Sequence, residues 1–146
     1  MDQIHYGLKG IKLTEYFVDE SIELDEESDV NYNASIRSIT DQEEIHFTIT
    51  ANYKKKKSGQ EFLRGSAVTV FMIKEMRKYT QLVNGSEVIN FPDPFLVALF
   101  GISFTHARAL FASSAGATKF AAMLLPLINP EIVFKQIFAQ HLDGFR

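Results

Sequence analysis

Residues 45–53 read Ile-His-Phe-Thr-Ile-Thr-Ala-Asn-Tyr, and their side chains alternate between apolar and polar along the segment. This period of two is typical of a β-strand with one buried face and one solvated face. The next segment, Lys54–Gln60, contains Ser58-Gly59, a pair that favours a turn. We therefore expect an antiparallel hairpin between residues 45–53 and the apolar run that follows the turn.

The predicted sheet contains three other strands. Leu8–Val18 carries an irregularity near Gly10 that predicts a β-bulge, and Val30–Ile39 alternates regularly. Glu61–Ile73 has apolar side chains on both faces, which implies that both faces are covered. Part of that cover is expected from another copy of the chain, through one face of this strand: Phe62, Val68, Val70 and Met72.

A long helix is predicted after a connector. Residues 74–92 mix apolar and polar side chains, and we expect them to pack on the domain or to close over a groove. Asp93 is a candidate N-cap, and Pro94 would occupy the first helical position. An apolar stripe at helical spacing then runs to about Ala115, where Gly116 fits a C-terminal cap.

Two shorter helices are predicted after the long one. Lys119–Leu125 is a helical stretch that stops before Pro126. Asn129-Pro130-Glu131 has the composition of a helix start, and Gly144 would end the final helix. Strands followed by helices indicate a single α+β domain over residues 1–146, built on an antiparallel sheet.

The composition excludes several classes of protein. None of the 146 residues is cysteine, so disulfides, thiolate metal sites and cysteine nucleophiles are excluded. Residues 1–50 hold 12 acidic and 3 basic side chains. This excess of acidic side chains argues against a nucleic-acid-binding protein, because phosphate binding needs a basic face. The acidic third is either a solvated surface or a docking face for a basic partner.

No motif for catalysis is present. The four histidines lack the spacing of a zinc helix, and there is no phosphate-binding loop and no nucleophile motif. His106 and Ser113 could share a helix face, but a polar helix face explains them as well. We predict no catalytic residue, no metal and no cofactor.

Phenylalanine is unusually frequent in the second half of the chain. Nine of the 13 phenylalanines lie between Phe91 and the C-terminus. They either fill a core or line an adaptable apolar surface that accepts varied partners, and the residues alone leave both possibilities open.

Neither a leader nor a membrane-spanning segment is predicted. The first residues lack a basic segment followed by an apolar run. The most apolar stretch, Phe95–Ala115, is interrupted by His106 and Arg108. We therefore expect a cytoplasmic protein without membrane insertion.

The order of these elements resembles that of the SecB protein-export chaperones and the SecB-like proteins. The resemblance rests on Phe62-Leu63 at the start of the last long strand and on Phe91-Pro92 just before the long helix. An apolar link, Leu124–Pro130, then leads into a final helix with Val133-Phe134 and Phe138.

This resemblance implies a fold and a function. It implies a four-stranded antiparallel sheet with a long helix and a shorter C-terminal helix on one face, in dimers or tetramers. It also implies an ATP-independent chaperone, a holdase that keeps unfolded or nascent polypeptides in an apolar groove. Carried over to this chain, the flexible wall of the groove would be Met76, Leu82, Val83, Ile89 and Phe91, and its lining or interface would be Phe95, Phe100, Phe134 and Phe138.

Two departures argue against docking to the export motor. The family docks that motor through acidic side chains on the last long strand and through a polar tail. Here Arg64-Gly65 follow Phe62-Leu63, and the sequence stops at Arg146. A restricted client, such as a toxin–antitoxin partner, is an alternative role. The competing hypotheses are a carrier of a small, lipid-like apolar ligand, a structural interaction protein of the same fold and, as the weakest, an enzyme.

Overall fold

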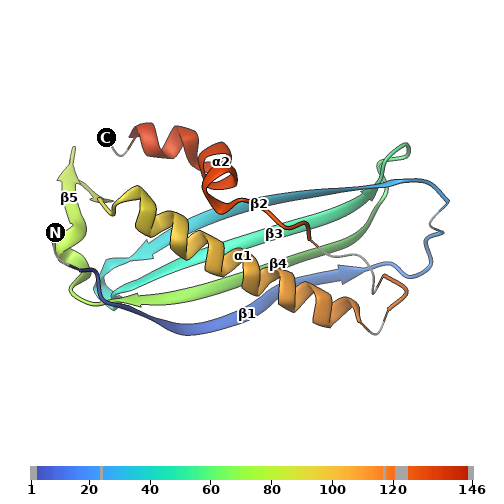
Figure 1. Ribbon diagram of the computed structural model, residues 1–146, viewed down its shortest axis with the longest axis horizontal. Helices are drawn as coiled ribbons and strands as arrows, with labels where there is room; N and C mark the ends of the chain where they lie inside the picture. Colours follow the sequence, from blue (N-terminus) through green and yellow to red (C-terminus); the bar gives the residue numbers. More distant parts are fainter. Residues whose placement is uncertain (1–2, 24, 117, 121–124, 145–146) are drawn as a thin grey trace.

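The computed structural model describes residues 3–23, 25–116, 118–120 and 125–144. They form a four-stranded antiparallel sheet in the order β1-β4-β3-β2, with two helices on one of its faces (Figure 1). The strands are β1 (Tyr6–Val18), β2 (Ser28–Ile39), β3 (Glu44–Lys55) and β4 (Glu61–Ile73), and the helices are α1 (Asp93–Ala115) and α2 (Pro130–Gly144). The predicted α+β architecture is confirmed.

The side chains of β3 alternate between a buried apolar face and an outer polar face, as predicted. Its apolar side chains lie under the helices and are at most 6% exposed: Ile45, Phe47, Ile49, Ala51 and Tyr53. The polar side chains between them point to the opposite, outer face of the sheet. On β4 the buried face carries Leu63, Ala67, Phe71 and Ile73, all of which belong to the same core as the β3 residues. The core therefore lies between the sheet and α1.

Phe62 departs from the predicted face of β4. The pairing of β3 with β4 is irregular between Tyr53 and Lys54, next to Phe62. The ring of Phe62 lies 6.4 Å from that of Tyr53 and 5.0 Å from that of Phe120, and its side chain is fully buried. Phe62 is thus a core residue, and its assignment to the outer face was wrong because a bulge breaks the strict period of two.

The rest of that predicted face lies on the outside of the sheet. Val68 and Val70 are half-buried, and Met72 is 46% exposed. Opposite them on β1 lie Gly7, which pairs with Met72, and Gly10, which pairs with Val70. Their expected role as an interface between copies stays a prediction.

The irregularity predicted near Gly10 is present. The register of β1 with β4 shifts between Leu8 and Gly10, and a second shift between Leu13 and Glu15 was not predicted. The acidic loop after β1 lies against the lysine-rich turn, because Lys55 Nζ lies 2.8 Å from Asp25 Oδ1.

The connector contains regular structure that was not predicted. A 3-10 turn, η2 (Met76–Tyr79), leads into a small hairpin of β5 (Thr80–Val83) and β6 (Ser86–Ile89). Asn84 and Gly85 join the two strands with φ angles of 51° and 81°. This Asn-Gly pair at positive φ is a favoured turn of tight hairpins, and it was the missed sequence signal.

α1 and α2 begin and end close to the residues predicted from the sequence. α1 covers Asp93–Ala115 as expected, although its N-cap is Pro92, and Asp93 lies in the first turn. At the start of α2, Asn129 Oδ1 accepts hydrogen bonds from the main-chain nitrogens of Glu131 and Ile132, at 3.1 and 3.4 Å. The predicted helix at Lys119–Leu125 lies largely outside the described residues, and Lys119 and Phe120 stand in a turn.

By length and composition alone, α1 is long and apolar enough to cross a membrane. Of the 18-residue stretch of α1 that meets this criterion, 33% is buried inside the domain. The core helix of a soluble protein meets the same criterion, so a single helix of this kind is weak evidence. The expected absence of membrane insertion therefore stays a prediction.

Candidate functional site

A hollow of about 540 Å³ opens where β2, β3, β6 and the two helices meet. Its apolar lining comes from five elements and the link before α1: Ile36, Ile45, Val88, Ile89, Phe91, Pro92, Pro94, Leu96 and Phe138. Its polar lining is Ser38, Glu87, Asn90 and Asp93. A concave, mostly apolar site with few polar groups is typical of a binding site.

Aromatic rings tilted against one another form the wall next to α1. The ring of Phe91 lies 5.1 Å from that of Tyr79 and 5.2 Å from that of Phe95. Across the hollow, Phe138 of α2 lies 4.8 Å from Phe134 and 6.2 Å from Phe100. The side of the hollow that α2 forms is thereby packed against the middle of α1.

The outer wall is the β5–β6 hairpin, which arginine ties to the body of the domain. Arg77 Nη1 lies 3.3 Å from Glu87 Oε1 on β6, and Arg77 Nη2 pairs with Asp41 of the turn between β2 and β3. All three side chains are exposed, so these contacts position the hairpin without contributing much stability. The rim carries two carboxylates, Glu87 and Asp93, of which Glu87 pairs with Arg77, and the described lining itself includes no lysine or arginine.

The nine predicted groove residues divide into four groups. Ile89, Phe91 and Phe138 line the hollow. Phe95 is half-buried beside it, packed on Phe91 and on Tyr6. Three of the nine are core residues that are at most 1% exposed: Met76, Phe100 and Phe134.

The last two, Leu82 and Val83, project from the end of the β5–β6 hairpin, where they are 76% and 47% exposed. They lie outside the hollow. Their apolar character, in place of the polar residues usual at a hairpin end, is the feature that suits them to a contact surface.

Sequence reasoning missed much of the lining. Ile36 and Ile45 read as ordinary alternating strand residues, Val88 as one apolar residue of the connector, and Leu96 as part of the apolar stripe of α1. No local signal separates them from core positions. They become lining residues because strand ends, hairpin and helices converge at one end of the sheet.

The ionisable groups that line the hollow are two carboxylates, Glu87 and Asp93. His106 lies elsewhere, with its Nδ1 3.2 Å from Thr69 Oγ1 of β4. Among the residues that the structure describes, no group of three or more His, Cys, Asp or Glu could hold a metal ion. The hollow thus combines a mainly apolar lining with two carboxylates, a composition typical of a binding site.

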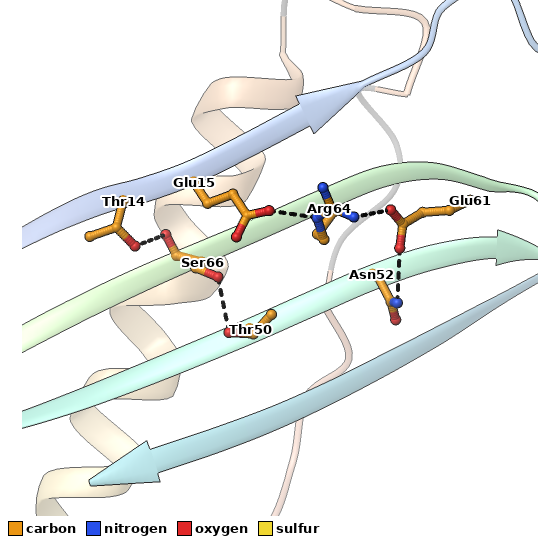
Figure 2. A network of polar contacts seen from close by, with 7 residues as sticks. All are labelled: Thr14, Glu15, Thr50, Asn52, Glu61, Arg64 and Ser66. Carbon is orange, nitrogen blue, oxygen red and sulfur yellow. Dashed lines mark hydrogen bonds and ion pairs between the residues drawn. The ribbon is translucent and has the colours of Figure 1, made fainter. Parts of the chain in front are cut away.

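The outer face of the sheet carries a paired polar network, with α1 on the far side of the strands (Figure 2). Arg64 Nε lies 2.6 Å from Glu15 Oε1, and its Nη1 lies 2.5 Å from Glu61 Oε1. Asn52 donates to Glu61 at 3.1 Å, and Arg64 lies over the ring of Phe17. Further along, the hydroxyls of Thr50 and Ser66 lie 2.9 Å apart, and that of Thr14 donates to Ser66 O.

A second paired acid lies on the same face. Glu44 is 4% exposed and lies 2.5 Å from Lys9 Nζ and 3.1 Å from His46 Nε2. The hydrogen bond from Lys9, followed by that from His46, lowers the pKa of the Glu44 carboxyl. Glu15, Glu61 and Glu44 thus all have cationic partners within the chain.

Comparisons with known proteins agree with this architecture. A solved structure of the Mycobacterium tuberculosis SecB-like chaperone Rv1957, in complex with a ChAD peptide from the Rv1956 HigA1 antitoxin, matches with a TM-score of 0.54. The fold is SecB-like. The match covers 84% of this chain and 86% of the other, at 9% sequence identity, so it concerns the fold alone. No family model and no curated protein matches the sequence.

Proposed function

We propose that this protein is an ATP-independent holdase that binds extended, unfolded polypeptide segments in the apolar hollow beside α1. The observation that carries the proposal is the hollow itself, walled by the short β5–β6 hairpin and floored by the sheet. Pockets that take up alternate side chains of an extended segment are a recurring mode of peptide binding, and apolar surfaces that can re-pack accept varied partners. A volume of about 540 Å³ has room for a few large apolar side chains.

The SecB-like fold supports a polypeptide ligand. The matched structure is that of a chaperone in complex with an antitoxin peptide. We extend this ligand class to the present chain. A restricted client such as an antitoxin is therefore a reasonable partner, as is a broader set of unfolded proteins in the cytoplasm.

We also propose that copies of the chain assemble as dimers or tetramers. Along α1, Ala98, Thr105 and Ala109 are exposed on the side away from the sheet. These small, uncharged side chains leave room for another copy of the chain to pack on this face of α1. Docking to an export motor finds no support on the outer sheet face, since its glutamates already have partners.

An aggregation-suppression assay tests the function. Unfolded client is diluted into buffer with stoichiometric amounts of the protein, and light scattering is followed. We expect scattering to fall in proportion to the protein added, without ATP. No suppression at stoichiometric amounts would contradict the proposal.

A matched pair of variants assigns the activity to the hollow. Val88 lines it, whereas Gln81, its cross-strand partner on β5, is exposed and does not. Val88→Asp places a charge in the apolar lining and should abolish suppression. Gln81→Asp introduces the same charge on the same hairpin and should leave suppression intact.

A carrier of a small apolar ligand is the second candidate, favoured by the small-molecule size and mainly apolar lining of the hollow. It predicts that lipid or another apolar compound is extracted with solvent from the purified protein in stoichiometric amount. The holdase predicts none, together with suppression of aggregation.

A further inference from the structure

The tip of the β5–β6 hairpin combines a reactive sequence with high exposure. Among the six asparagines of the chain, Asn84 alone is followed by glycine. Asn84 and Gly85 are both exposed, and a side chain at Gly85 would meet no atom within 4 Å. The main-chain nitrogen of Gly85 therefore belongs to an exposed residue without a side chain that could hinder it.

We propose that Asn84 is a site of spontaneous deamidation, which converts the tip of the hairpin to an aspartyl or isoaspartyl turn. In the first step Gly85 N bonds to Cγ of Asn84, the bond from Cγ to Nδ2 breaks, and ammonia leaves with the proton of the attacking nitrogen. The product is a five-membered succinimide. Water then opens the ring and restores a carboxylate, with no change of oxidation state.

Water attacks either carbonyl of the ring. Opening of the new bond from Cγ to Gly85 N gives aspartate with the normal main chain. Opening of the original main-chain bond gives isoaspartate, in which the chain continues through Cβ and Cγ. Both products replace a neutral amide with a negative charge on a hairpin that already carries Glu87.

The weakness of the hairpin makes the reaction accessible. The succinimide ring fixes the rotation of Asn84 about its Cα–C bond, which the tight turn with Asn84 and Gly85 at positive φ also fixes, so the turn must open before the attack. β5 and β6 have four residues each and pair with each other, while Leu82 and Val83 beside the turn remain exposed. Two-stranded hairpins of this size are marginal in water, and local opening at such sites is frequent.

The isoaspartyl product would change the wall of the hollow. The two-residue turn sets the pairing of Val83 with Ser86 and of Leu82 with Glu87. An additional methylene in the main chain no longer fits that turn, so the register that places Glu87 and Val88 at the hollow would loosen. This consequence for client binding rests on the proposed function, whereas the modification itself does not.

Peptide mapping of the aged protein tests the proposal. The full-length folded chain is incubated at mildly alkaline pH, digested at intervals, and each asparagine is followed by mass spectrometry, with isoaspartate separated by chromatography. We expect Asn84 to convert first, while Asn33, exposed in the middle of β2 and followed by alanine, stays intact. An unchanged Asn84, or earlier conversion of any other asparagine, would overturn the proposal.

Asn84→Gly provides the matched control. Glycine tolerates the positive φ and removes the reactive amide, so this variant should show no conversion at the tip. Aged wild-type protein is then compared with aged Asn84→Gly protein for suppression of client aggregation. A loss confined to the aged wild type supports the effect on the wall, and equal activity rejects that effect. Absence of suppression in fresh protein would instead reject the holdase function alone.

Discussion

The ring of Phe62 on β4 lies 5.0 Å from the ring of Phe120, tilted by 35°, and both side chains are fully buried. This contact joins the far end of the sheet to the turn that follows α1. Phe62→Ala would leave a cavity there that the strand cannot fill, and should lower the free energy of unfolding by about 3–5 kcal/mol. Urea denaturation measures this loss.

Met72→Ala is the control for that prediction, since Met72 lies on the outer face and is 46% exposed. Its unfolding free energy should change little. If the outer face joins two copies of the chain, light scattering should detect a smaller assembly for Met72→Ala than for the wild type. Phe62→Ala should form the same assembly as the wild type under conditions in which it is folded. Equal stability of Phe62→Ala and the wild type would contradict the core assignment.

Gly65 has no room for a side chain. A Cβ at this position would lie 2.5 Å from Cε1 of Phe111, which is itself 6% exposed and packed in the core. We expect Gly65→Ala to destabilise the fold by about 1–3 kcal/mol, because α1 must move away from β4. In Gly10→Ala the new methyl group meets no atom within 4 Å, so its denaturation midpoint should stay near that of the wild type.

The ionisation of Glu44 makes the free energy of unfolding depend on pH in the acidic range. Lys9 and then His46 lower the pKa of its carboxyl from the ordinary value of 4.5. Because the folded-state pKa is the lower one, ionised Glu44 contributes stability that is fully present above the unfolded-state pKa and is lost as pH falls through the folded-state value. The gap in stability between wild type and Glu44→Gln should therefore narrow on acidification. Urea midpoints from neutral to acidic pH measure it, and a constant gap would refute the linkage.

The acidic rim predicts a preference among clients. Glu87 and Asp93 line the hollow, so an apolar peptide with a lysine beside its aromatic residues should bind more tightly than a neutral one, and salt should reduce the difference. Glu87→Gln should weaken the lysine peptide by no more than about two- to fivefold, the range of an exposed ion pair, because Arg77 already shares the Glu87 carboxylate.

Glu75→Gln is the matched control, because Glu75 is an exposed acid of the same connector that pairs with Lys78 and does not line the hollow. Fluorescence anisotropy with labelled peptides compares the two variants. Equal affinity of both peptides for the wild type would show that the rim charges play no part.

Patterns within single segments predicted most of the secondary structure. The alternation of residues 45–53, the bulge at Gly10 and the caps around Pro94 and Asn129 are local, since each depends on a few neighbours along the chain. The β5–β6 hairpin was also encoded locally, in Asn84-Gly85. It was missed because its strands are short and their flanking residues do not alternate clearly.

The sequence by itself determined the strands, the helices and their order, because hydrophobic period, turn chemistry and capping act over a few residues. Tertiary structure alone decided which apolar residues are core and which line a site. Phe100 and Phe134 are buried, while Ile36 and Val88 border the hollow, although all four are apolar residues in regular elements. The physical reason is that the exposure of a side chain depends on what packs against it from distant segments. Phe138 and Ile45 line the same hollow only after the sheet and both helices have assembled.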